Sequence, residues 1–139
     1  MSEPPDRPVG LILDTTAILA FTDPKLAIHV GEPLTEAEDN GELLGLPLPC
    51  LVEAARTTTS GLLDLLVGSD SVVVLAEDPA SWRALASMWE LVGRPGAATA
   101  ALFGLDLDVL VLTREPGRYR SVRDGELAIA IPGSDASDT

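Results

Sequence analysis

Two acidic side chains follow apolar segments of the chain, where they could take part in metal chemistry. Asp14 comes directly after the apolar run 9–13, and Glu115 lies just past the apolar run 108–113. We expect both runs to be buried parallel strands, whose carboxyl ends are the usual place for a site in an open sheet. Carboxylates gathered there suit Mg²⁺ or Mn²⁺, which could activate water and stabilise a phosphodiester during its cleavage. Taken singly, each acid fits a helix cap or a turn residue equally well.

Basic residues are concentrated beside Glu115. Four of the nine Lys and Arg residues lie within ten positions: Arg114, Arg118, Arg120 and Arg123. One interpretation is that Arg114, Arg118 and Arg120 bind nucleic-acid phosphates at the edge of the same cleft. The other, which the acidic composition favours, is that the cluster forms salt bridges with surrounding carboxylates.

The overall charge limits the classes of function. The 139 residues include 9 Lys and Arg against 22 Asp and Glu, giving a formal net charge of −13. A general binder of phosphate backbones needs a surplus of basic residues and is therefore excluded, whereas a small local patch is not. Acids are dense and unaccompanied by bases over residues 32–42, which predicts a solvated helical face. The alternative for this run is a docking surface for a basic partner.

Alternating apolar and helical patterns predict an α/β fold with a mainly parallel sheet. The expected strands are 9–13, 71–76, 108–113 and 127–131. The expected helices cover 17–21, 50–57 and 61–67, with two more starting near residues 78 and 96. Thr15 or Thr16 is expected to cap the first helix, and Pro33 and Gly41 to interrupt helical fragments within 25–42. Trp82, Leu85, Ala86 and Trp89 have the spacing of a core-facing stripe.

The chain is organised as one domain with polar ends. Residues 1–8 and 133–139 are expected to be a flexible arm and a flexible tail, flanking a domain over 9–132. No apolar run approaches the roughly 20 residues of a membrane helix. With no apparent signal peptide and the single cysteine Cys50, a cytoplasmic location is expected, and the composition suggests a bacterial source. Cys50 is expected to be a buried structural thiol, and His29 has no partner that suggests a catalytic triad.

Three segments together resemble the PIN domain family. VGLILDTTAILA over residues 9–20 resembles its opening strand, Asp and small-apolar helix. LPLPCLVEAAR over 46–56 is similar to the segment that places a glutamate on a helix after a proline-containing approach. LVLTREPGRY over 110–119 is similar to the segment with Thr, an acid and a Pro-x-x-Tyr turn. The three occur in the family order across residues 9–132.

The resemblance implies a three-layer α/β/α sandwich and, in active members, a ribonuclease using Mg²⁺ or Mn²⁺, often as the toxin of a toxin–antitoxin pair. It places Asp14 and Glu53 as the first two metal-binding acids, and Glu115 where the family usually has aspartate. The remaining acid would open the helix that starts near Gly96-Ala97-Ala98-Thr99, but no Asp or Glu lies between Glu90 and Asp106. Thr99 offers only a neutral oxygen.

We therefore expect an incomplete nuclease site, because Mg²⁺ tolerates few errors in ligand placement and the longer side chain of Glu115 displaces its oxygens by about 1 Å. The expected function is a PIN-like binding or regulatory module with impaired or no catalysis, in which metal binding is weak or absent. The alternative is an active Mg²⁺- or Mn²⁺-dependent endoribonuclease of toxin–antitoxin type, with Asp14, Glu53 and Glu115 as its metal-binding and catalytic residues. RNA, an antitoxin-like or basic protein and a second copy in a homodimer are the expected partners.

Overall fold

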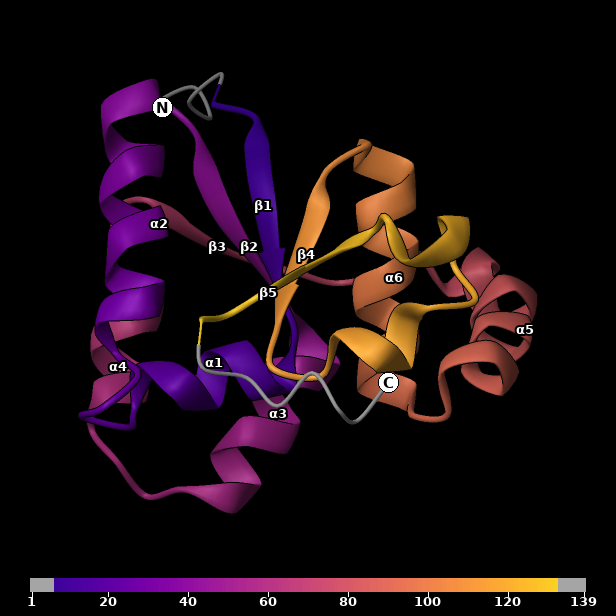
Figure 1. Cartoon of the computed structure of the whole chain (residues 1–139), viewed down its shortest axis with the longest axis horizontal. Helices are drawn as coiled ribbons and strands as arrows, with labels where there is room; N and C mark the ends of the chain where they lie inside the picture. Colours follow the sequence, from indigo (N-terminus) through magenta and orange to yellow (C-terminus); the bar gives the residue numbers. More distant parts are fainter. Residues whose placement is uncertain (1–6, 133–139) are drawn as a thin grey trace.

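A five-stranded, wholly parallel sheet runs through the middle of residues 7–132, the part of the chain that this computed structural model describes (Figure 1). The strand order is β3-β2-β1-β4-β5. The bounds are β1 Val9–Leu13, β2 Leu43–Pro47, β3 Val72–Leu75, β4 Leu110–Thr113 and β5 Ala128–Ala130. The order reverses between β1 and β4, and such a switch point opens a crevice at the carboxyl ends of the strands.

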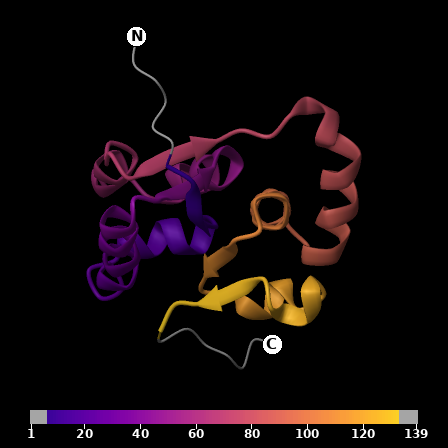
Figure 2. The same ribbon diagram turned by 90° about the horizontal axis from the view of Figure 1, so that it is seen from above.

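Helices cover both faces of the sheet, which confirms the predicted three-layer α/β/α architecture. They are α1 Thr15–Phe21, α2 Ile28–Asn40, α3 Leu48–Thr57, α4 Leu62–Val67, α5 Trp82–Val92 and α6 Pro95–Leu107. Seen from above, α1 and α2 lie on one side of the sheet, whereas α6 lies on the other with α5 outside it (Figure 2). No helix within residues 7–132 is long and apolar enough to cross a membrane.

Strand β2 was not predicted, because its sequence has Gly45 in the middle and Pro47 at the end. The structure places it between β1 and β3, with most of its residues buried. A side chain at Gly45 would meet Leu75 Cδ1 at 2.7 Å and Ile12 Cδ1 at 2.9 Å, so the strand needs a glycine there. Pro47 occupies the last strand position and leads directly into α3, where a missing N–H is tolerated.

Helix α2 continues past Pro33, contrary to the predicted interruption. Its buried residues Val30 and Ala37 lie on either side of the proline, and tertiary packing thus outweighs the lost hydrogen bond. Gly41 ends the helix with φ of 69°, the left-handed conformation that favours glycine. The helix presents its acids to solvent, as predicted, namely Glu32, Glu36, Glu38 and Asp39.

The two tryptophans of α5 are not in the core, which corrects the predicted stripe. Trp82 is 59% exposed and Trp89 50% exposed, whereas Met88 and Val92 are buried. Leu85, Met88 and Val92 form the side of the helix that packs towards α6, and the tryptophans lie at the edge of that side. Periodicity predicts a broad apolar face, but which part of it is buried depends on the partner element.

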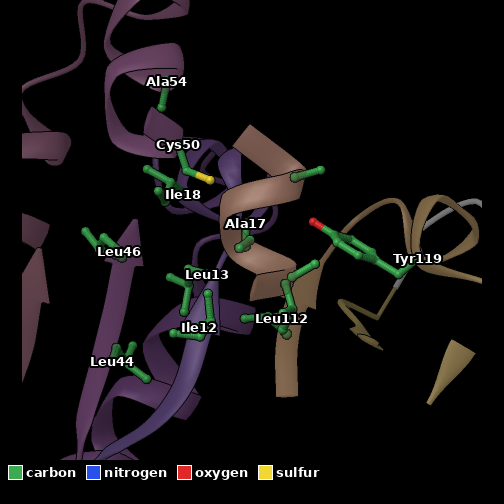
Figure 3. Close-up of a cluster of buried hydrophobic side chains, with 14 of the residues drawn as sticks. Ile12, Leu13, Ala17, Ile18, Leu44, Leu46, Cys50, Ala54, Leu112 and Tyr119 are labelled. Carbon is green, nitrogen blue, oxygen red and sulfur yellow. The ribbon is translucent and has the colours of Figure 1, made fainter. Parts of the chain in front are cut away.

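Helix α6 is built for close packing, as its alanine-rich sequence predicts. Ala98, Ala101 and Gly104 are buried, and a side chain at Gly104 would lie 2.9 Å from Leu127 Cδ1. The core continues through β1, β2 and β4 to Cys50 and Tyr119 (Figure 3).

The predicted arm and tail lie mostly outside the described residues, since these begin at residue 7 and end at residue 132. The last part of the expected arm is held in place. Arg7 donates hydrogen bonds to the backbone carbonyls of Glu42 and Asp70 and to the hydroxyl of Ser71. The carbonyl of Pro8 accepts from the backbone N–H of Leu43. Arg7 and Pro8 are therefore hydrogen-bonded to segments of the sheet region.

Candidate functional site

The candidate site lies at the carboxyl end of the sheet, beside the switch point between β1 and β4. Helix α1 starts there from β1, and α3 contacts both α1 and α6. This arrangement brings together Asp14, Glu53 and Glu115, which line one small pocket. Residues far apart in the sequence thus meet because three connections end at the same edge of the sheet.

Asp14 caps helix α1, a role that the sequence assigned to Thr15 or Thr16. Its Oδ1 accepts the backbone N–H of Ala17 at 3.1 Å and the hydroxyl of Thr16 at 2.7 Å. A carboxylate at this position stabilises a helix by satisfying free N–H groups. Thr16 in turn accepts the backbone N–H of Arg114, which ties the start of α1 to the end of β4.

Tyr119 completes the surroundings of Asp14. Its hydroxyl donates to Asp14 Oδ2 at 2.7 Å, and the ring is fully buried after the turn that follows β4 (Figure 3). Asp14 is only 3% exposed, and burial raises the pKa of its carboxyl group, although the donated hydrogen bonds act in the opposite direction. Burial and then the charge of Asp14 raise the pKa of Tyr119, so this phenol stays protonated and remains a donor.

Glu53 projects from α3 and binds the first turn of α6. Its Oε2 accepts the backbone N–H of Gly96 at 3.2 Å, and its Oε1 accepts the hydroxyl of Thr15 at 2.9 Å. The N-terminus of a helix attracts negative charge, and the N-cap Arg94 forms no side-chain cap. A side chain at Gly96 would lie 2.7 Å from Glu53 Oε1, so glycine makes room for this carboxylate. Glu53 therefore supplies, from another helix, the negative charge that the start of α6 lacks.

The capping of α6 by Glu53 predicts how a substitution of this glutamate changes the free energy of unfolding. Replacing Glu53 with Gln should lower the free energy of unfolding by about 1 kcal/mol, because a neutral amide loses the attraction to the N-terminus of α6. Chemical denaturation measures the change, and Glu36→Gln on the exposed face of α2 controls for the loss of one negative charge. A more stable Glu53→Gln variant would instead show that repulsion between Glu53 and the neighbouring acids dominates, contradicting the capping role.

Glu115 is engaged by an arginine of its own segment. Arg118 Nε lies 2.9 Å from Glu115 Oε1, and Arg118 Nη1 donates to the carbonyl of Val92 at 3.0 Å. The arginine thereby joins the turn after β4 to the C-terminal end of α5, where a positive charge is favourable. The backbone N–H of Glu115 donates to the hydroxyl of Thr113.

The pocket between the three acids is small and is shared with two arginines. Its volume is only about 10 Å³, and Arg94 and Arg118 line it together with the acids. Within residues 7–132, no three Asp, Glu, His or Cys side chains are grouped so that they could hold a metal ion. Helix α6 contributes Ala97 to the lining, at the end where the family resemblance places a further acid.

Part of the arginine cluster is engaged in salt bridges. Arg118 pairs with Glu115 and Arg123 with Asp108, as the salt-bridge interpretation expects. Arg114 and Arg120 are exposed and form no ion pair with any residue of the described part of the chain. Arg120 lines an open pocket of about 600 Å³ beside the acids, between α5 and the turn after β4.

Cys50 is buried, as predicted, and its Sγ donates to the carbonyl of Gly96 at 3.1 Å. Burial, followed by the charge of Asp14, raises the pKa of this thiol. His29 lies half-buried in the first turn of α2. The sequence did not predict two contacts of the site. Thr15, expected as a possible cap of α1, donates to Glu53, and Tyr119, expected only as part of the Pro-x-x-Tyr turn, donates to Asp14.

A scan against protein-family models finds no match to this chain, and a search of curated proteins finds no significant relative. The likeness to the PIN family is confined to the three segments that carry Asp14, Glu53 and Glu115.

Proposed function

We propose that the chain is a PIN-like domain whose nuclease site is incomplete and which acts as a binding or regulatory module. One observation carries the proposal: each of the three acids at the carboxyl edge of the sheet is already held by donors of the same chain. Asp14 caps α1 and accepts from Tyr119, Glu53 caps α6, and Glu115 pairs with Arg118. Metal binding would have to compete with these contacts, in a pocket where two arginines offset part of the charge of the three acids.

Two arginines without an ion pair in the described part of the chain, Arg114 and Arg120, indicate the ligand; we call them the rim of the site. Arg114 and Arg120 are exposed beside the acids, and phosphate groups are the ligands that such guanidinium groups bind best. We propose that this rim binds RNA without efficient cleavage, in the cytoplasm of a bacterial cell. The interaction should be local and weakened by salt, because the chain as a whole is strongly acidic.

Calorimetric titration of Mn²⁺ and Mg²⁺ into the wild type and Asp14→Asn tests the proposal that the nuclease site is incomplete. We expect weak binding or none, with little difference between the two proteins, and no RNA cleavage under the same conditions. Cleavage that depends on Mn²⁺ and disappears in Asp14→Asn would overturn the proposal. It would establish the alternative, an active endoribonuclease of toxin–antitoxin type that uses Asp14, Glu53 and Glu115.

A second measurement tests the RNA-binding rim. Fluorescence anisotropy with a labelled single-stranded RNA should show binding that weakens as salt increases and that is reduced in Arg114→Gln and Arg120→Gln. Arg56→Gln, on the exposed C-terminal end of α3, is the matched control. Binding that is unchanged in both rim variants would exclude this surface.

A further inference from the structure

The outer surface of α5 carries apolar side chains that lie exposed. Trp82 and Trp89 are seven residues apart and therefore lie two helical turns apart on one side, with the exposed Ala86 between them. The adjacent side of the helix, with Met88 and Val92, is buried, and Leu85 is packed against the core between that side and the tryptophans. A soluble protein rarely exposes two tryptophans on one stripe unless that stripe has a partner.

Two residues of opposite charge lie along one side of this stripe. Arg83 and Glu90 are also seven residues apart, each directly following one of the tryptophans. Arg83 stacks over the ring of Trp82 with its Cζ 4.3 Å from the ring centroid. Neither Arg83 nor Glu90 forms an ion pair within residues 7–132. This surface is thus locally neutral, on a chain whose net charge is −13.

The spacing makes the stripe complementary to itself. When two α5 helices lie antiparallel about a two-fold axis near Ala86, residues on one flank of a helix meet residues on the same flank of its copy. Trp82 then faces Trp89 of the second copy, and Arg83 faces Glu90 of the second copy. Each contact occurs twice, as a two-fold interface requires. The small side chain of Ala86 at the axis lets the helices approach.

We propose that this chain forms a homodimer through α5, with Trp82, Arg83, Ala86, Trp89 and Glu90 at the interface. A parallel two-fold pairing would put the Arg83 and Glu90 flanks of the two helices on opposite sides of the interface, so only the antiparallel arrangement pairs these charges. The local neutrality also explains how two strongly acidic chains can associate at this place. Helix α5 has 11 residues and is about 16 Å long, so the interface is small and the dimer is reversible.

Sedimentation velocity over a range of protein concentrations tests the dimer. The wild type should change from monomer to dimer as concentration rises. Ala86→Glu, which places two like charges at the axis, should remain monomeric. Glu90→Arg should weaken the dimer about tenfold because two arginines then face each other, and Arg83→Glu should do the same. The double variant Arg83→Glu with Glu90→Arg restores both ion pairs and should restore the dimer.

Leu65→Glu is the matched control, because Leu65 is 67% exposed on α4 rather than on α5. The two tryptophans of the chain, Trp82 and Trp89, provide a second signal. Their fluorescence should shift to shorter wavelength as the dimer forms, since both side chains leave water. A wild type that stays monomeric at its highest soluble concentration would overturn the proposal. A dimer that Ala86→Glu leaves intact, or a double variant no better than the single ones, would show that α5 is not the interface.

Discussion

Asp14→Asn should make the protein more stable at neutral pH. Burial raises the pKa of Asp14, which means that keeping the carboxylate ionised in the folded state costs free energy. Asparagine has the same shape and no charge, and its carbonyl oxygen can keep the hydrogen bonds from Ala17 and Thr16. We expect the free energy of unfolding to rise, because the ionised carboxylate is the form that burial disfavours. Denaturant unfolding at pH 7 in metal-free buffer measures this gain.

The pH dependence gives the prediction a definite sign. The folded-state pKa of Asp14 lies above its ordinary value of 3.8, so the folded protein binds more protons than the unfolded chain between the two values. The free energy of unfolding of the wild type therefore falls as pH rises through this window, relative to that of Asp14→Asn. The advantage of the variant should be smallest below pH 3.8, grow through the window and then stay constant.

Tyr119→Phe separates the charge of Asp14 from its hydrogen bond. Removing the hydroxyl takes away one donor to the buried carboxylate, so Tyr119→Phe should destabilise the wild type by about 1–3 kcal/mol. The same substitution should cost less in Asp14→Asn, because an uncharged amide depends less on that donor. An Asp14→Asn protein that is less stable than the wild type at every pH would show that the lost contacts outweigh the buried charge.

Ala97→Asp should convert the small pocket into a site that binds Mn²⁺. Ala97 is the third residue of α6 and lines the pocket with Asp14, Glu53 and Glu115. A carboxylate there would add the missing negative charge, and the N-terminus of the helix would favour it. We expect Mn²⁺ to bind at least about tenfold more tightly than to the wild type by calorimetry. Added Mn²⁺ should also raise the melting temperature of the variant, because it binds only the folded state.

Ala97→Asn is the control, since it has the same size and lacks the charge. It should bind Mn²⁺ no better than the wild type, and both variants should be less stable than the wild type without metal because position 97 is buried. Unchanged Mn²⁺ affinity in a folded Ala97→Asp protein would contradict the view that one missing acid limits the site. The arginines in the lining, Arg94 and Arg118, would then be what excludes the metal.

The fold class could be predicted from the sequence because its signals are local. The apolar runs around Ile12, Val73 and Val111 each predict a strand, and helical spacing separates them. Strand β2 escaped prediction because Gly45 and Pro47 have low strand propensity, and only the neighbours β1 and β3 compensate for it.

Residue types and their order along the chain were enough to identify the acids that could take part in metal chemistry. The sequence placed Asp14 and Glu115 at strand ends, suggested Glu53 through a family resemblance, and marked the absence of an acid near Gly96. Those conclusions depend on residue identity and on the order of elements along the chain, and both can be read directly.

Tertiary packing determines which distant groups donate hydrogen bonds to the carboxylates of Asp14 and Glu53. Glu53 caps α6 and Tyr119 donates to Asp14, and both contacts join elements distant in sequence. The exposure of Trp89 likewise depends on how α5 packs against α6. A hydrogen bond or a buried face depends on how helices pack against the sheet, and the local pattern leaves more than one packing open. The contacts of Asp14 with Tyr119 and of Glu53 with Gly96 therefore could not be read from spacing in the sequence, whereas the pairing of Glu115 with Arg118 three residues later is local.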